Sequence, residues 1–352
     1  MILLTGANGH LGANLLRRLL ADGAHVRVLL RPQSDNSTIN GLKVEHAFGD
    51  LRDPASLLAT SKGCTSIYHC AAQVSTVSRG EHDIFSNNVL GTRNLLRVAL
   101  ENGVQRVVVS GSLSATGHLP DRPTDETVPF NPFERHMPYS VSKSSVEHEC
   151  LKAVADGLDV VTAVSCAILG PNDFKPSRMG QVLLEYAHRH RGAYVPGGFE
   201  FVAADDIVEG HLLAMKKGRT GQKYIFSTEF MTMDQLFDLF GEVTGQPNMR
   251  LRLPPMIMSG VAEIGDFIYR NFLPGRRQLL TPAAVRLLCM GRRADTSKAQ
   301  RELGYRPGSI REAVRQAYDW FVARGMIERA RPMAYGGSPG KTAGAGAKAR
   351  PS

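Results

Sequence analysis

Short apolar runs alternate with segments of helical periodicity along the first half of the chain. The runs are rich in Val, Ile and Leu, and they predict strands at residues 2–6, 25–31, 43–51, 66–72, 106–112 and 160–170. Between them apolar residues recur at helical spacing, as in NLLRRLLADG and in the stretch 81–103. Apolar strands that alternate with helices indicate a parallel sheet covered on both faces. The predicted fold class is therefore α/β, with a doubly wound parallel sheet that places ligands at the carboxyl ends of its strands.

The pattern changes after about residue 172, and helical segments dominate from 232 to 325. This change predicts a smaller, mostly helical C-terminal lobe that binds the substrate. The expected division is a sheet domain at 1–172, with 199–228 returning to it, and a substrate lobe at 173–198 and 229–330. The Gly- and Ala-rich tail at 334–352 has too little to bury and is predicted to be disordered.

Net charge adds little to this picture. The chain has 352 residues, is 43% hydrophobic and carries a formal charge of +9. Lys341, Lys348 and Arg350 in the tail account for part of that charge, and the rest is spread along the chain without interleaved aromatic residues. A phosphate-rich cofactor explains such a balance, so no nucleic-acid partner is predicted.

The cysteines and the apolar runs bound the class of protein further. The cysteines do not stand at metal-ligand spacing; they are Cys64, Cys70, Cys150, Cys166 and Cys289. Reduced thiols, no metal site and a cytoplasmic location are expected. No charged leader region precedes the first strand, and no apolar run approaches the length of a membrane span. The expected partner is a small molecule.

The clearest binding motif is TGANGHLG, between the first predicted strand and the first predicted helix. In that context Gly6 permits a tight turn, Gly9 lets the backbone approach a pyrophosphate, and Gly12 lets the helix pack on the strand. The N–H groups and the dipole at the helix start attract phosphates. Rossmann-type dinucleotide binding is expected, with contacts from Gly6, Asn8, Gly9, His10 and Leu11. The alternative is a strand-to-helix turn that holds no ligand.

The end of the second predicted strand indicates which dinucleotide binds. Arg31 stands there with no acid beside it, and a guanidinium matches a 2′-phosphate in charge and geometry. NADP(H) is therefore favoured over NAD(H), unless Arg31 is an ordinary exposed loop residue. After the third strand, Asp50 is placed to accept a hydrogen bond from the adenine amino group, and Leu51 to offer its backbone. Asp50 could instead cap the helix that follows.

The motifs TGANGHLG, GDLRD, HCAA, NNVLGTRNLL, SGSLSATG and YSVSK occur in this order along the chain, followed by DTSKAQRELGYRP. They resemble the extended short-chain dehydrogenase/reductase family over about residues 1–325, and within it the branch of dihydroflavonol reductases and 3β-hydroxysteroid dehydrogenases. The resemblance implies that Ala71 and Ala72 let the cofactor pass over a strand end. It also implies that Asn88 supports the active-site end of the central strands. His69 is expected to be structural.

The segment YSVSK supplies the candidate chemistry. Pro138 suits the first position of a helix, so Tyr139 and Lys143, four residues apart, would share one helix face. An ammonium near a phenol favours the phenolate and would pull the pKa of Tyr139 down. Ser112, just past a predicted strand, could hydrogen-bond a substrate carbonyl oxygen. Taken alone, the Tyr–Lys pair is more simply explained as an ordinary exposed pair.

The resemblance assigns roles to these residues. Tyr139 is the proton donor or acceptor, Lys143 tunes it and can bind the nicotinamide ribose, and Ser112 orients the substrate oxygen. Ser114 is a second hydroxyl that could share the task of Ser112. His136, just before the helix, could reach a substrate.

The likeness departs from the family at the predicted sixth strand. There the family usually has Arg or Asn followed by Pro, whereas this chain has Val164 and Ser165. Ser165, Ala167 and Ile168 are expected to line the nicotinamide with altered packing. Asp205 stands where an arginine is common. These departures weaken any inference of the substrate from the family.

The predicted function is an NADP(H)-dependent oxidoreductase acting on a carbonyl or secondary alcohol of a cyclic, fairly apolar small molecule. Residues 254–273 are unusually apolar and could cap such a substrate. One rival is a sugar-nucleotide epimerase or dehydratase with tightly held NAD, kept open by Arg276, Arg277, Arg292 and Arg293. A more remote rival is a non-catalytic dinucleotide sensor. A homodimer through a four-helix bundle is possible, built from helices at 88–100 and 139–154.

Overall fold

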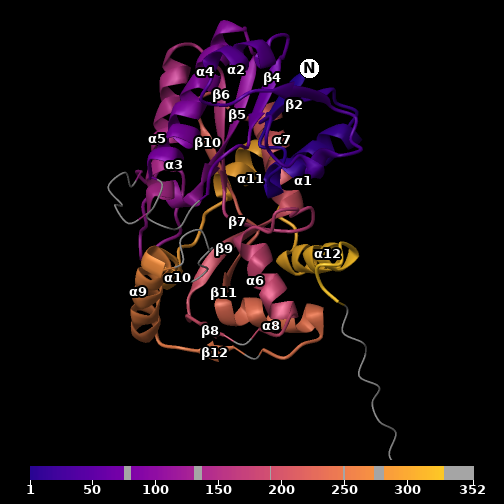
Figure 1. Ribbon diagram of the computed structural model, residues 1–352. Helices are drawn as coiled ribbons and strands as arrows, with labels where there is room; N and C mark the ends of the chain where they lie inside the picture. Colours follow the sequence, from indigo (N-terminus) through magenta and orange to yellow (C-terminus); the bar gives the residue numbers. More distant parts are fainter. Residues whose placement is uncertain (75–80, 131–136, 191, 249, 273–280, 329–352) are drawn as a thin grey trace, which may run out of the picture.

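The computed structural model describes residues 1–74, 81–130, 137–190, 192–248, 250–272 and 281–328. The tail predicted at 334–352 lies outside the described residues, as do His136, Arg276 and Arg277. Within the described part, a large sheet carries helices on both faces, and a mostly helical lobe lies at one end of it (Figure 1).

Seven parallel strands of the described chain form the main sheet, in the order β10-β6-β5-β4-β1-β2-β3. They are β1 (Ile2–Thr5), β2 (Val26–Leu30), β3 (Glu45–Phe48), β4 (Ser66–His69), β5 (Arg106–Ser112), β6 (Val160–Ser165) and β10 (Lys223–Phe226). The order reverses between β1 and β4, the switch point at which such sheets bind ligands. The predicted doubly wound α/β fold is confirmed.

Helices cover both faces of this sheet (Figure 1). One layer contains α2 (Pro54–Ser61), α4 (Gly91–Glu101) and α5 (Pro138–Ala155), and the other contains α1 (His10–Ala21), α7 (Ala204–Lys217) and α11 (Ser297–Leu303). Alternate residues of a strand face opposite sides. Leu3 accordingly packs into the apolar cluster beneath the first layer, and Leu4 into the cluster beneath the second. Burial on both faces explains the apolar runs of the inner strands, whereas the edge strand β3 is mostly exposed and contains Glu45 and His46.

The lobe has its own core. Its helices are α6 (Arg178–Ala187), α8 (Met233–Thr244), α9 (Pro255–Phe272), α10 (Pro282–Met290) and α12 (Ile310–Ala323). Its strands are β7 (Ala167–Leu169), β8 (Ala193–Tyr194), β9 (Gly198–Ala203), β11 (Glu229–Thr232) and β12 (Leu251–Arg252). Leu183, Phe237, Phe240 and Phe321 are fully buried between these elements. The predicted helical C-terminal part is confirmed.

The elements of 199–228 divide between two sheets. β10 joins the main sheet and α7 covers it, but β9 pairs with β7 and β11 in a separate three-stranded sheet. The reason is that β7 continues from the end of β6 toward the lobe and pairs Ala167 with Phe201. Four short helical turns complete the described elements: η1 (Ser37–Ile39), α3 (Glu81–Phe85), η2 (Ser86–Leu90) and η3 (Leu113–Ala115).

Helix α9 packs against α10 through Met258 and Ala262, which are buried with Val285. Its other face is apolar and open to solvent: Met256 is 86% exposed and Ile264 is 64% exposed. The apolar residues of α9 therefore divide between a small face that is packed against α10 and a face that is exposed to solvent.

Candidate active site

The carboxyl edge of the main sheet collects the residues predicted from the sequence. They are Gly6 after β1, Arg31 after β2, Asp50 after β3, Ala71 and Ala72 after β4, Ser112 at the end of β5 and Ser165 at the end of β6. Because neighbouring parallel strands end together, residues from distant parts of the chain meet there. Ser112 and Ser165, for example, are direct register partners.

The glycine turn packs too closely to tolerate side chains at two of its glycines. Gly6 has a positive φ of 77°, and a Cβ there would lie 2.5 Å from the backbone nitrogen of Ala71. A Cβ on Gly12 would collide with the carbonyl oxygen of Gly6. Gly9 differs, because a Cβ there would meet only that same oxygen, at 3.4 Å. The space in front of Gly9 is therefore open.

The turn fits a bound dinucleotide. Helix α1 begins after Gly9 with no side-chain cap and no acid in its first turn, so its N–H groups and dipole are available to phosphate. Asn8 Oδ1 and His10 Nδ1 are buried and lack hydrogen-bond partners among the described residues. Buried polar atoms in proteins normally have partners, so these two atoms are suited to a ligand. Leu11 packs partly against the core.

The ends of β2 and β3 bring Arg31 and Asp50 near each other. Arg31 is exposed, and its positive charge helps to lower the pKa of Asp50. The largest cause of that lowering is Arg52, whose guanidinium donates to both carboxylate oxygens of Asp50 at 2.9 Å. An adenine amino group would thus share the Asp50 carboxylate with Arg52. The residue that caps α2 is Asp53 rather than Asp50, and the backbone oxygen of Leu51 accepts from Asn94.

Helix α5 positions Tyr139 and Lys143. It begins at Pro138, as expected, so the two side chains lie one turn apart. Lys143 is only 5% exposed, and its Nζ donates to the carbonyl oxygen of Ser110 at 2.8 Å. Burial lowers the pKa of Lys143 to about 8. The ammonium is therefore close to losing its proton near neutral pH.

Tyr139 and the serines of β5 meet at the end of that strand. Burial raises the pKa of Tyr139 above its usual value, and a hydrogen bond with Ser112 opposes that rise. The downward pull expected from Lys143 is therefore not the dominant effect on this phenol, since the lysine is directed at Ser110. Ser112 Oγ lies 2.9 Å from Ser114 Oγ, so the two hydroxyls share a hydrogen bond.

Sequence reasoning missed a buried chain of hydrogen bonds that passes through His69. Thr5 Oγ1 lies 2.7 Å from His69 Nδ1, and Thr92 Oγ1 lies 2.9 Å from His69 Nε2. Burial lowers the pKa of His69 to about 3, so the ring is neutral and carries one proton. Thr92 donates its own proton to the carbonyl oxygen of Asn88 at 2.5 Å and must accept from the ring. The ring proton is therefore on Nε2, and Thr5 donates to Nδ1.

The network of hydrogen bonds continues from Asn88 to α5. Asn88 lies in the π-helical turn η2, and its Nδ2 donates to Ser142 Oγ at 3.0 Å. Ser142 in turn donates to the carbonyl oxygen of Tyr139 at 2.7 Å. At the other end, the backbone N–H of Ala71 donates to Thr5 Oγ1 at 3.3 Å. The network thus links the strand ends beside the glycine turn to the backbone of Tyr139. The motifs HCAA and NNVLGT contain its members, but their spacing gives no sign that they bond to one another.

Comparison with known proteins decides the family. A model of the NAD dependent epimerase/dehydratase family matches residues 2–226. The chain belongs to this family. It is 43% identical over 325 residues to Sterol demethylase protein B of Methylococcus capsulatus, covering 92% of this chain and 99% of that protein. It is 31% identical over 329 residues to a candidate dihydroflavonol 4-reductase of Synechocystis, covering 92% and 95%. The crystal structure of gox2253 has a TM-score of 0.82 and 33% identity, covering 93% and 99%.

The predicted resemblance to the extended short-chain dehydrogenase/reductase family, in the reductase and steroid-dehydrogenase branch, is confirmed. The protein is an enzyme of the epimerase/dehydratase family, and this family depends on NAD or NADP. The remote alternative of a non-catalytic sensor is therefore set aside.

In this member of the family the segment after β6 turns away from the main sheet. Ser165 ends β6, and its Oγ donates to the carbonyl oxygen of Cys166 at 3.1 Å. Ala167 and Ile168 are half-buried in β7, which pairs with β9. All three residues predicted to line the nicotinamide thus lie where the sheet passes into the lobe.

The sequence indicates Arg292 only as a possible diphosphate ligand. In the structure its guanidinium bonds to the backbone near the end of β5. Its Nη1 donates to the carbonyl oxygens of Leu113 and Thr116, at 2.7 and 2.9 Å. These carbonyls border the turn that carries Ser114, so Arg292 ties the segment after α10 to the serine loop. Arg293 is exposed, with its guanidinium 4.8 Å from the centre of the Phe230 ring.

The described residues contain neither a metal-binding cluster nor a membrane-spanning helix. No group of three or more His, Cys, Asp or Glu side chains in this part of the chain could hold a metal ion. None of the helices built from these residues is long and apolar enough to cross a membrane.

Proposed function

We propose that this protein is an NADP(H)-dependent oxidoreductase that interconverts a carbonyl and a secondary alcohol on a cyclic, fairly apolar small molecule. The observation that carries the proposal is the meeting of Ser112, Tyr139 and Lys143 at the carboxyl edge of the sheet. A phenol, a hydroxyl and a buried ammonium are the groups that proton transfer to a developing alkoxide requires.

The residues divide the work in the reducing direction. Tyr139 donates its proton to the substrate oxygen as that oxygen gains negative charge. Ser112 donates a hydrogen bond to the same oxygen and is itself held in place by Ser114. Lys143 supplies a positive charge that favours the resulting phenolate. The nicotinamide, when bound, supplies or accepts the hydride.

Two observations support an apolar substrate. The relatives reported above are named for a sterol and for a dihydroflavonol, and both molecules are polycyclic. The lobe also presents an open apolar face on α9, with Met256, Ile257 and Ile264 exposed. We propose that the lobe, 173–198 and 229–330, binds the substrate and that α9 caps it.

Turnover of purified protein with NADPH tests the reaction class. Cyclic ketones, including a 3-ketosteroid and a dihydroflavonol, are assayed beside UDP- and dTDP-sugars. We expect at least one ketone to be reduced, with one NADPH consumed for each alcohol formed. An isomerised or dehydrated sugar nucleotide, formed without net consumption of cofactor, would instead establish the epimerase or dehydratase alternative. That alternative is weakened by Arg292, which is engaged with the serine loop.

We propose that Arg31 selects NADP(H) by binding the 2′-phosphate. Its guanidinium is exposed at the end of β2, where the adenosine ribose of a bound dinucleotide is expected. Arg31→Ala is expected to weaken NADPH binding by about tenfold or more, or about 1.4 kcal/mol, and to leave NADH binding nearly unchanged. Fluorescence titration with both cofactors measures this effect. Arg97→Ala, which removes an exposed arginine on α4, is the matched control. Equal losses for both cofactors would contradict the selective role.

A homodimer and a cytoplasmic location stay predictions. Helices α4 and α5 pack side by side, and they expose Leu100 and Leu151, which are 40% and 49% exposed. These side chains are available for pairing across a two-fold axis.

A further inference from the structure

Lys143 is surrounded by groups that are almost all uncharged at neutral pH. Five titratable groups among the described residues interact electrostatically with Lys143. They are His69 at the end of β4, Cys70 after it, His211 on α7, and Glu147 and Cys150 on α5. Burial lowers the pKa of His69 to about 3 and that of His211 to about 4, so both imidazoles are neutral. Burial raises the pKa of Cys70 to about 11 and that of Cys150 to about 12, so both thiols keep their protons.

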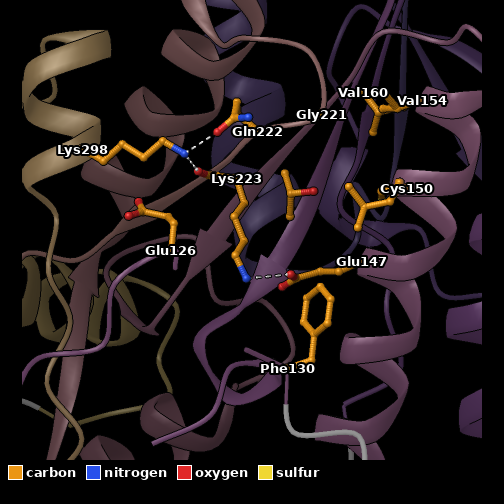
Figure 2. A pocket seen from close by; sticks show the side chains of 12 residues that line it. Glu126, Phe130, Glu147, Cys150, Val154, Val160, Gly221, Gln222, Lys223 and Lys298 are labelled. Atoms are coloured by element: carbon orange, nitrogen blue, oxygen red, sulfur yellow. Dashed lines mark hydrogen bonds and ion pairs between the residues drawn. The ribbon is translucent and has the colours of Figure 1, made fainter. Parts of the chain in front are cut away.

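Glu147 is the remaining member of this set of described residues, and its partners favour the ionised form. It follows Lys143 by one turn of α5 and is only 4% exposed. Its Oε2 accepts from Lys223 Nζ at 3.1 Å, whereas its Oε1 is buried without a partner among the described residues. Lys223 also lies over the ring of Phe130, 4.7 Å from its centre. Figure 2 shows this ion pair above the Phe130 ring.

A cavity of about 170 Å³ adjoins the pair. Its walls come from α5, β6, the start of β10 and α11, and Glu126 and Lys298 face it as well (Figure 2). A space of this size has room for water. The pKa of Glu147 is raised overall, because burial outweighs the lowering by Lys223, Lys143 and the neighbouring His148. The ion pair with Lys223 offsets part of the cost of burying the carboxylate.

We propose that Glu147 is a positioning residue for the reaction, whose carboxylate, held ionised by Lys223 beside the cavity, keeps the Lys143 ammonium charged. The proposal rests on the proposed function of Lys143. Lys143 makes its one described hydrogen bond to a neutral carbonyl group, that of Ser110. Against burial, Cys150 and Cys70 raise the pKa of Lys143 most, and Glu147 raises it as well. Of these three groups, Glu147 is the one that forms an ion pair with a lysine, so it is the one that we take to carry a negative charge. Residues four apart on a helix have Cβ atoms about 6 Å apart, close enough for one charge to act on the other.

The sign of the effect follows from the pKa of Lys143, which lies at about 8. The ammonium is present below that pH and is lost above it, so reduction should decline on the alkaline side as Lys143 deprotonates. Removing the negative charge of Glu147 lowers the pKa of Lys143 further. The alkaline decline of turnover then begins at a lower pH.

The full-length variant Glu147→Gln tests this inference, because it removes the charge and keeps the shape. We expect the alkaline limb of kcat to move down by on the order of one pH unit, with kcat at pH 6 little changed. Glu149→Gln is the matched control: Glu149 is on the same helix but pairs with Arg93, at 2.8 and 3.0 Å. It should leave the limb in place.

A second readout does not depend on turnover. The pKa of Lys143 can be followed by NMR titration of ¹⁵N-labelled lysine amines, with Lys143→Met to assign the signal. It should fall by the same amount in Glu147→Gln. If the protein binds NADPH but reduces no carbonyl, the proposed function fails while this titration still decides the role of Glu147. A Lys143 pKa that is the same in Glu147→Gln and in the unmodified protein would overturn the inference.

Discussion

Replacement of Tyr139 by phenylalanine is expected to lower turnover by about 10²–10⁴-fold, the range over which a positioned proton donor contributes. Phenylalanine keeps the aromatic ring and removes only the hydroxyl that donates the proton. The ring lies in the first turn of α5, next to the hydroxyl of Ser112. Because Lys143 donates to the carbonyl oxygen of Ser110 and not to the phenol, its position should survive the change. Steady-state kinetics with NADPH and the best ketone measure the loss.

Cofactor titration is the control for Tyr139→Phe. NADPH should bind the variant within a few-fold of its affinity for the unmodified protein, because the glycine turn and Arg31 are untouched. Unchanged turnover would remove Tyr139 from the chemistry. A loss of binding as large as the loss of turnover would show that the phenol holds the cofactor and does not donate the proton.

The Gly12→Ala variant is expected to lose measurable binding of both NADPH and NADH. Its methyl group would overlap the carbonyl oxygen of Gly6 and lie 2.7 Å from the carbonyl carbon. Backbone atoms cannot move aside as a flexible side chain can, so α1 must shift away from the turn. Such overpacking costs about 1–3 kcal/mol of folding free energy and displaces the N–H groups that face the phosphates. Thermal unfolding without cofactor and fluorescence titration with cofactor measure the two effects.

Gly9→Ala is the matched control for Gly12→Ala. A Cβ on Gly9 would meet only the Gly6 oxygen, at 3.4 Å, and the backbone there is extended, with φ −89° and ψ 165°. The melting temperature without cofactor should therefore hardly change. Cofactor affinity should still fall by about tenfold, because the methyl group occupies the open space in front of the turn. Full-strength binding by Gly9→Ala would place the pyrophosphate elsewhere.

The sequence was sufficient wherever the determining contacts are local. The glycine turn, the start of α5 at Pro138 and the one-turn spacing of Tyr139 and Lys143 follow from residues within a few positions of one another. The apolar strands indicated the fold class for a similar reason, since a strand that is buried on both faces is apolar at successive positions.

What the sequence could not predict depends on contacts between distant segments. Nothing near Asp50 indicates that it pairs with Arg52 while Asp53 caps the helix, because both acids suit either position. The contact of Arg292 with the serine loop joins residues more than 170 positions apart. The ring of His69 lies between a side chain of strand β1 and one of helix α4, so its proton could be placed only after the fold was known.

The hydrogen-bond chain through His69 limits how freely the protein can be recombined with its relatives. Every donor in it is already assigned, from the Ala71 amide through the imidazole to Asn88, Ser142 and the backbone of Tyr139. A chimera that exchanges α5 alone, or the segment after β4 alone, would leave a buried donor or acceptor unmatched at the junction. The first half of the chain is thus best exchanged as one block that runs from β1 through α5.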